Sequence, residues 1–210
     1  MASKLAPLRK RSLDPANNLM GQGYRLIAGI DEVGRGCLAG PVVAAAVILP
    51  FPYTIDGIRD SKKLTDIRRR ALSQQIKEVA IGYAIAEVEV EKIDSIGIQK
   101  SCQLAMAKAI KELSPQPEYL LIDGNITIPS QLPQQSIIKG DDLSIVIGAA
   151  SIIAKVYRDD LMIKLDSEFP QFGFKEHKGY GTEFHCSAIR IHGPSSLHRK
   201  TFARVKEYVS

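Results

Sequence analysis

The segment Pro41–Leu49 is a nearly continuous apolar run, and it constrains the fold more than any other feature of the chain. Successive side chains point to opposite faces of a strand, so a strand that is apolar throughout must be covered on both faces. The run is also too short to span a bilayer, which takes roughly 20 apolar residues. It therefore predicts an inner strand of a sheet with helices on both faces, in a protein that does not enter the membrane.

Further strands and helices are indicated around this run by the period of their apolar residues. Strands are expected over Tyr24–Ile30, where the strand ends at an acid, and over Ile81–Val90, Tyr119–Ile122 and Gln135–Ile138. Helices are expected over Thr65–Val79, Ile98–Leu113, Ser144–Glu168 (one long helix or two joined ones), Thr182–Ile191 and Ser196–Tyr208. This order predicts an α/β domain around a mixed five-stranded sheet flanked by helices, with a C-terminal helical region.

Charge and composition suggest how the chain is organised and what it binds. Residues 1–22 are expected to form a basic, flexible tail, and residues 23–210 to form a single domain. Lys and Arg number 28 against 23 Asp and Glu, which favours a polyanionic partner. Basic residues gather at Lys4, Arg9, Lys10 and Arg11, at Arg68–Arg70, and at His198–Lys200 with Arg204 and Lys206.

The cysteines are isolated and odd in number, at Cys37, Cys102 and Cys186. This spacing argues against a disulfide framework and against a structural zinc site. The start of the chain lacks the apolar segment of a secretory signal, although an organellar transit peptide remains an alternative to a basic tail. We therefore expect a cytoplasmic protein.

Two predicted strands end in the same way, with an apolar run, an acid and a glycine-containing loop. Asp31 and Glu32 follow the first run, and Asp123 and Gly124 follow the second. Sites in open α/β sheets form just beyond strand ends. If these strands are parallel neighbours, Asp31 and Asp123 face each other across one cleft.

Two further acids, Asp141 and Asp142, follow a glycine at the end of the next strand. Three or four carboxylates without a histidine or cysteine cluster form a ligand set suited to Mg²⁺ or Mn²⁺, and such ions support phosphodiester hydrolysis. A solvated turn at Asp31 and Glu32, or acids placed at a helix N-terminus, are the alternatives. Because adjacent strand residues point to opposite faces, Asp31 and Glu32 can serve one site only if the chain bends there.

Three loops carry residues suited to nucleic-acid contact. The loop Gly34–Gly36 lets a backbone approach phosphate or sugar closely, with Arg35 as its charged contact. Asp60–Lys63 offers Lys62 to backbone phosphates, and Tyr180 lies between two glycines, where its ring can stack on a base or sugar. An ordinary turn, solvated lysines and a half-buried tyrosine are the respective alternatives.

Several short motifs follow one another in order between about Leu26 and Phe202. They are Ile30–Gly36, Asp60–Leu64, Leu121–Asn125, Lys139–Asp141, Ala149–Val156 with Arg158 and Asp159, Phe169–Gln171, His177–Tyr180, and His192–Pro194 with His198 and Arg199. Together they resemble the ribonuclease HII family. The resemblance implies a ribonuclease H-like fold and endonucleolytic hydrolysis of the RNA strand of RNA–DNA hybrids, and also cutting at single ribonucleotides embedded in duplex DNA.

The resemblance also implies the residues that act. Asp31, Glu32, Asp123 and Asp141 look like the four carboxylates that hold Mn²⁺ or Mg²⁺, with two ions during hydrolysis to 5′-phosphate and 3′-hydroxyl ends. Asp141 fits better than Asp142 because it directly follows Lys139 and Gly140. Gly34, Arg35 and Gly36 look like the loop that reads the ribose 2′-hydroxyl, and Tyr180 like the residue that stacks on the neighbouring deoxyribose. Cys37 has no assigned role.

Two rival functions stay open at this point. One is another nuclease of similar fold, either integrase-like or of the HIII type; the HIII type carries an additional N-terminal domain, which we do not expect because the first predicted strand begins at Tyr24. The other is a non-catalytic protein that binds hybrids. We expect a monomer whose partners are RNA–DNA hybrids and DNA containing ribonucleotides.

Overall fold

The computed structural model describes residues 14–53, 55–58 and 64–209, and it contains a five-stranded sheet of order β3-β2-β1-β4-β5. The strands are β1 (Ile27–Val33), β2 (Val42–Ile48), β3 (Gly82–Val88), β4 (Tyr119–Asp123) and β5 (Gln134–Ile137). β2 pairs antiparallel with both β1 and β3, whereas β4 pairs parallel with both β1 and β5. The mixed five-stranded sheet predicted from the sequence is therefore confirmed.

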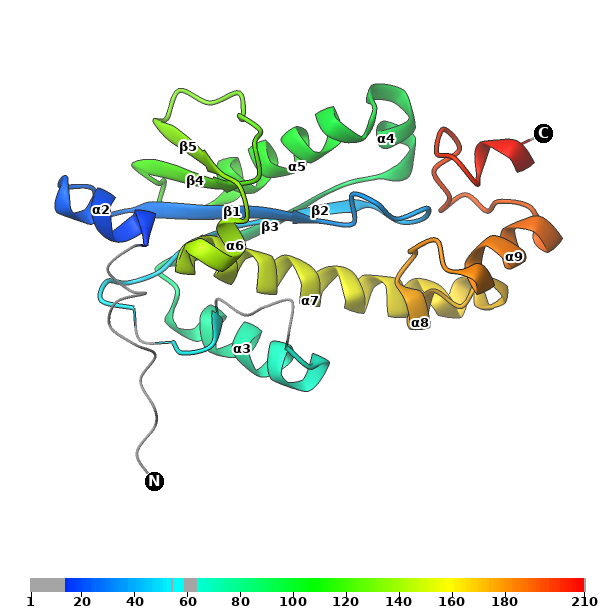
Figure 1. Ribbon diagram of the computed structural model, residues 1–210, viewed down its shortest axis with the longest axis horizontal. Helices are drawn as coiled ribbons and strands as arrows, with labels where there is room; N and C mark the ends of the chain where they lie inside the picture. Colours follow the sequence, from blue (N-terminus) through cyan, green and yellow to red (C-terminus); the bar gives the residue numbers. More distant parts are fainter. Residues whose placement is uncertain (1–13, 54, 59–63, 210) are drawn as a thin grey trace.

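Helices cover both faces of this sheet, as Figure 1 shows. The helical elements are α2 (Pro15–Gly21), α3 (Asp66–Val79), α4 (Val90–Ile96), α5 (Ile98–Glu112), α6 (Gly140–Leu143), α7 (Ile145–Glu168), η2 (Pro170–Phe172), α8 (Phe174–His177), α9 (Glu183–His192) and η3 (Lys206–Tyr208). α3 and α7 lie on one face, and α4 and α5 lie on the other. The segment predicted as one or two helices over Ser144–Glu168 is a single helix, α7. No helix in the described ranges is both long and apolar enough to cross a bilayer.

The apolar strand β2 is buried along its whole length, as its composition predicts. Val43, Ala45 and Val47 pack on the α7 side of the sheet. Its alternate residues pack on the α5 side. Each face of the strand therefore contributes to a separate half of the core, because the strand lies between two helical layers.

The helix α7 packs very closely on β1. A Cβ atom added at Gly29 would lie 2.1 Å from the carbonyl carbon of Val146 and 2.3 Å from the nitrogen of Ile147. Only glycine allows backbone to meet backbone in this way. The backbone of α7 therefore lies directly against the backbone of β1.

The expected flexible tail extends too far into the chain. Residues 15–21 form α2, whose Ala16 and Leu19 are buried in the core. The Asp14 carboxylate caps this helix by accepting from the Ala16 N–H at 3.0 Å, and it also accepts from the Ile145 N–H at 2.9 Å. Two apolar residues give too weak a pattern to reveal such a short helix. The rest of the expected tail, residues 1–13, lies outside the described residues.

The predicted closing helix over Ser196–Tyr208 is wrong. In this segment only Lys206–Tyr208 is helical, as a single 3₁₀ turn. The Arg199 N–H donates to the Leu38 carbonyl at 2.9 Å, and the next two backbone N–H groups donate to the Asp94 carboxylate. Backbone groups used in these long-range bonds are not available for an α-helix.

Candidate active site

The acidic pair lies where β1 runs past the end of β4. The parallel ladder between the two strands ends at Ile30 and Ile122, whereas the ladder between β1 and β2 continues without interruption through Asp31, Glu32 and Val33. The predicted strand thus begins and ends three residues later than expected. The predicted bend at Asp31 is absent.

Asp31 and Glu32 reach the same cavity from opposite faces of β1. The Asp31 carboxylate lies on the α7 side, where it has a hydrogen bond with Ser151. Glu32 has the same strand parity as Ile30, which packs on the α5 side. β4 ends at Asp123, and its pairing with β1 ends one residue earlier, at Ile30 and Ile122. Beyond this point the edge of β1 is open, and the Asp31 and Glu32 side chains both line the cavity there. An open strand edge therefore replaces the bend that the sequence argument required.

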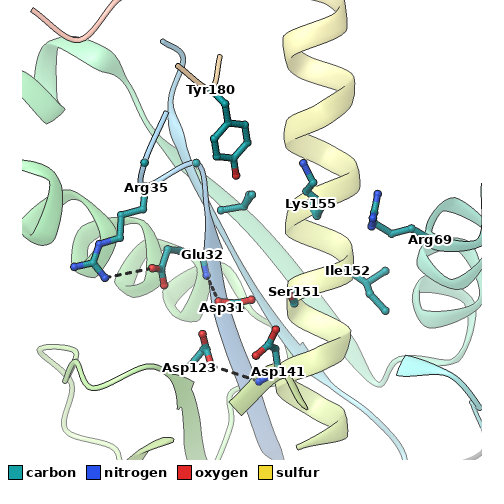
Figure 2. Close-up of a pocket in the computed structure, with 13 residues that line it drawn as sticks. Asp31, Glu32, Arg35, Arg69, Asp123, Asp141, Ser151, Ile152, Lys155 and Tyr180 are labelled. Carbon is teal, nitrogen blue, oxygen red and sulfur yellow. Dashed lines mark hydrogen bonds and ion pairs between the residues drawn. The ribbon is translucent and has the colours of Figure 1, made fainter. Parts of the chain in front are cut away.

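The cavity has a volume of about 410 Å³ and gathers most of the residues that the motifs indicate. It is lined by the carboxylates Asp31, Glu32, Asp123 and Asp141, the loop Val33–Gly36, the polar and charged side chains of Arg69, Ser151 and Lys155, and Ile152 and Tyr180. Figure 2 shows the four carboxylates together, with Tyr180 above them and its hydroxyl end directed toward them. Lys62 lies outside the described residues, so its predicted contact stays a prediction.

The short helix α6 places Asp141 beside Asp123. The Asp123 Oδ1 accepts from the Gly140 N–H at 2.6 Å and from the Asp141 N–H at 3.4 Å. A Cβ atom at Gly140 would lie 2.6 Å from the Ile147 side chain and 3.2 Å from Asp123 Oδ1, so a larger residue here would displace both side chains. Asp141 is 1% exposed and lines the cavity, whereas its neighbour Asp142 is exposed and does not. The geometry thus favours Asp141 of the two acids.

Negative charge is concentrated at this site. Burial raises the pKa of Asp31 well above its usual value, and the charges of Asp123 and Glu32 raise it further. The Glu32 N–H donates to Asp31 Oδ1 at 2.7 Å, which offsets only part of this effect. Burial also raises the pKa of Glu32, against the opposing charge of Arg35 at 3.9 Å. A bound cation would relieve this repulsion.

The chemistry of the donor set fits a hard divalent cation. The ionisable metal ligands around the cavity are carboxylates, and no histidine or cysteine of residues 14–53, 55–58 and 64–209 lines it. Oxygen ligands of this kind suit Mg²⁺ and Mn²⁺. Within the described part of the chain, no three His, Cys, Asp or Glu side chains are already arranged to hold an ion. The four carboxylates are neighbours that line one cavity.

Comparison with known proteins decides the family. The family model for ribonuclease HII matches residues 28–206, and the ribonuclease HII of Desulfitobacterium hafniense (strain DSM 10664 / DCB-2) is 53% identical over 186 residues, which are 88% of this chain and 71% of that protein. The chain belongs to the ribonuclease HII family. It is thus a metal-dependent ribonuclease H that acts on RNA–DNA hybrids, and the non-catalytic alternative is excluded.

Two solved structures show that this ribonuclease HII has the fold implied by the resemblance. The ribonuclease H2 from Pyrococcus horikoshii OT3 superposes with a TM-score of 0.74 at 23% identity, covering 87% of this chain and 96% of that one. The Bst-RNase HIII in complex with Mn²⁺ superposes with a TM-score of 0.68 at 20% identity, covering 99% and 74%. The predicted ribonuclease H-like fold is confirmed.

A lysine and a tyrosine form the side of the ribonuclease HII cavity opposite the acids. Lys155 Nζ lies 2.7 Å from Asp159 Oδ1 and 5.8 Å from the centre of the Tyr180 ring. Tyr180 is 42% exposed, and its hydroxyl donates to the buried Cys37 sulfur, which gives Cys37 a structural role. Lys155 is not among the site residues that the sequence predicts. Its spacing of one helical turn from Ser151 is the signal that places it in the cavity.

Two fully buried arginines hold the substrate loops, and sequence reasoning did not predict this role. Arg158 donates to the carbonyls of Ala39, Pro41 and Lys178 at 2.8–3.0 Å. Arg199 donates twice to the Gly40 carbonyl and once to the Arg35 carbonyl, also at 2.8–3.0 Å. Together they join the loop after β1 to the loop that carries Tyr180. Guanidinium groups suit this task because each offers several donors in one plane.

Proposed function

We propose that this ribonuclease HII cuts at single ribonucleotides embedded in duplex DNA, in addition to RNA–DNA hybrids, and that it uses two divalent ions to do so. The observation that carries the proposal is one cavity lined by all four carboxylates, by the loop Gly34–Gly36 and by Tyr180. The carboxylates supply the hydrolytic end of the cavity. The loop and the tyrosine supply the means to recognise a ribose next to a deoxyribose.

Asp31, Glu32, Asp123 and Asp141 are the residues that would hold the ions. Support comes from their shared cavity, from the charge repulsion at Asp31, and from the Bst-RNase HIII of the same fold, which was solved with Mn²⁺. When bound, two such ions activate water and stabilise the leaving 3′ oxygen, so that cleavage yields 5′-phosphate and 3′-hydroxyl ends.

The loop Gly34–Gly36 recognises the ribose. Gly34 has a φ of +92°, and a Cβ atom there would lie 2.2 Å from the Arg158 side chain, so only glycine fits between Arg158 and the cavity that this loop lines. Backbone groups can then donate to or accept from a 2′-hydroxyl, the group that separates RNA from DNA. Arg35, with a half-exposed side chain near Glu32, is the charged contact to the adjacent phosphate.

Tyr180 identifies the step from ribose to deoxyribose. Its ring is partly exposed above the carboxylates. Its hydroxyl donates to Cys37, and Lys155 Nζ lies 5.8 Å from the ring centre. A flat ring in this position stacks on the sugar that follows the ribose, and it packs more closely on a deoxyribose than on a sugar that carries a 2′-hydroxyl. Among the residues that the structure describes, no histidine lines the cavity, and no proton transfer is assigned to an imidazole.

Paired substrates and paired variants test the proposal. We expect Asp123→Asn and Asp141→Asn to abolish cleavage of a uniform hybrid and of a duplex with one ribonucleotide, while both substrates still bind. Asp142→Asn is the matched control, because this acid is exposed and adjacent. Cleavage should return with Mg²⁺ or Mn²⁺ after chelation. Normal turnover by Asp123→Asn in metal-replete buffer would refute the assignment.

The tyrosine has its own test. Tyr180→Ala should lower the preference for the single-ribonucleotide duplex over the uniform hybrid, whereas Tyr180→Phe keeps the ring and should preserve most of that preference. An unchanged preference in Tyr180→Ala would count against the stacking role while leaving the carboxylate assignment intact.

A further inference from the structure

Three histidines that the proposed chemistry does not use lie behind Tyr180. His185 and His198 are fully buried, and their Nε2 atoms lie 3.0 Å apart. His185 Nδ1 lies 2.9 Å from the Tyr180 carbonyl, and His198 Nδ1 lies 3.0 Å from the Ser195 backbone nitrogen. A continuous chain of hydrogen bonds thus runs from Ser195 to the backbone of Tyr180.

The direction of every bond in this chain follows from its first member. The Ser195 N–H can only donate, so His198 Nδ1 accepts from it and carries no proton. The Ser195 hydroxyl lies 2.9 Å from the same nitrogen and then also donates to it. A neutral His198 must then carry its proton on Nε2 and donate it to His185 Nε2. His185 in turn carries its proton on Nδ1 and donates it to the Tyr180 carbonyl. One backbone N–H therefore sets the tautomers of both rings.

His177 holds the other side of Tyr180. The Gly179 N–H donates to His177 Nδ1 at 3.2 Å, so the ring proton lies on Nε2 and is donated to the Phe172 carbonyl at 2.8 Å. The ring stacks on His185 with centroids 4.4 Å apart. The backbone is thus fixed just before Tyr180 by His177 and just after it by His185.

The surroundings keep these rings neutral. The rings of Phe172 and Phe174 pack against His198 at 4.6 and 5.7 Å, and Phe174 packs against His185 at 5.5 Å. The pKa of His185 is lowered to about 4 and that of His198 to about 3, mainly by burial and in smaller part by the neighbouring histidines.

His177 has a more varied charge environment. Burial is the main reason that its pKa is lowered; the charge of Lys178 acts in the same direction, and Asp166 and Glu176 oppose it. A second proton on His185 would lie on Nε2 and would face the Nε2 donor of His198. A second proton on His198 would lie on Nδ1 and would face the Ser195 N–H.

We propose that His198, His185 and His177 are positioning residues for Tyr180, and that their ordered tautomers give the tyrosine one fixed place above the carboxylates. This inference rests on the proposed function, in which Tyr180 contacts the sugar at the junction. A bond of defined direction at each end of the residue limits the backbone to one arrangement. Because the tyrosine ring is already ordered before the substrate binds, no conformational entropy is lost on ordering it, and this favours binding at the junction between a ribonucleotide and a deoxyribonucleotide.

Two substitutions at one position test the proposal. His185→Leu removes the donor to Tyr180, whereas His185→Asn places an amide nitrogen near the former Nδ1 and retains it. We expect His185→Leu to lower the preference for the single-ribonucleotide duplex by about fivefold to tenfold, as for one lost hydrogen bond, and His185→Asn to stay within about twofold of the native enzyme. The control is His192→Asn, an exposed position on α9 outside the chain of bonds. Equal effects of His185→Leu and His185→Asn would overturn the proposal.

The protonated nitrogen of each histidine ring can be measured by NMR on the native full chain, so this test depends neither on enzyme activity nor on whether a variant folds. Nitrogen-15 chemical shifts report which ring nitrogen carries the proton. We expect His185 to be protonated on Nδ1 and His198 on Nε2, without change from pH 8 down to about pH 5. The opposite tautomer at either ring, or titration near pH 6.5, would refute the ordered chain. If Asp123→Asn still cleaves, the proposed function fails while these tautomers stand, so the two failures are distinct.

Discussion

Substitution of Gly29 by alanine tests how the sheet and α7 together place the acidic site. Gly29 lies two residues before Asp31 in β1 and faces the backbone of α7. A Cβ atom there would lie 2.1, 2.2 and 2.3 Å from the Val146 carbonyl carbon, the Val146 oxygen and the Ile147 nitrogen. All three atoms belong to the backbone, so no side-chain rotation relieves the overlap. Ordinary contact begins at 3.4 Å, and β1 and α7 must therefore separate by more than an ångström.

The cost follows from this forced separation. Overpacking of a core costs about 1–3 kcal/mol, and a backbone clash belongs at the upper end of that range. For a domain of this size, about 3 kcal/mol lowers the melting temperature by about 6–12 °C. The same movement separates Ser151 on α7 from Asp31 on β1, and a misplacement of about 1 Å can slow an enzyme about 100-fold.

Thermal unfolding and single-turnover cleavage of a uniform hybrid measure the two effects separately. Cleavage is compared at a temperature where circular dichroism shows both proteins folded. Gly21→Ala is the matched control, because a Cβ atom there meets nothing within 4 Å. A Gly29→Ala protein with an unchanged melting temperature and normal cleavage would refute the argument that this contact places the site.

Three further predictions concern charge. Lys155 lines the cavity, where we expect its ammonium group to contact one substrate phosphate, so Lys155→Met should reduce the slope of log affinity against log salt by about one. Lys164 is exposed on the same helix, and Lys164→Met should leave this slope unchanged. Equal slopes for the two variants would count against the phosphate contact. Burial and neighbouring charge raise the pKa of Asp31, which means that its ionised form destabilises the folded protein, so Asp31→Asn should raise the melting temperature in chelator. The same variant should be stabilised less by Mn²⁺. A lower melting temperature in chelator would contradict this reasoning. The folded-state pKa values of His185 and His198, about 4 and about 3, lie below the ordinary 6.5, so the unfolded chain binds more protons as pH falls through this range. The free energy of unfolding, measured with urea, should therefore fall from pH 6.5 to about pH 4, and a constant value would contradict the buried neutral state.

Elements with a clear local pattern could be predicted from the sequence. The apolar run Pro41–Leu49 became the fully buried β2, and Thr65 caps α3 by accepting from the Arg68 N–H. The helix Ile98–Leu113 was placed within one residue of α5. Such features depend on residues within a few positions of one another, so a single sequence contains them.

Elements whose backbone bonds reach far along the chain could not be placed in this way. α2 is held by the bond from Ile145 to Asp14, and the segment after Arg199 is held by Leu38 and Asp94. These partners lie between about 100 and 160 positions away in the sequence, so the periodicity of nearby apolar residues does not predict them. The pattern over Ser196–Tyr208 resembles a helix, but its tertiary bonds prevent one.

For the candidate site, the sequence by itself determined which acids are available, their place at strand ends and, through ordered motifs, the family. Only the tertiary structure decided that Asp31 and Glu32 enter one cavity from opposite faces, because that depends on where β4 stops beside β1. It also decided that Arg158 and Arg199 hold the substrate loops and that buried histidines hold Tyr180. Residue types and apolar periods are local properties of a chain, whereas hydrogen-bond partners across 20 to 160 positions exist only once the chain has folded.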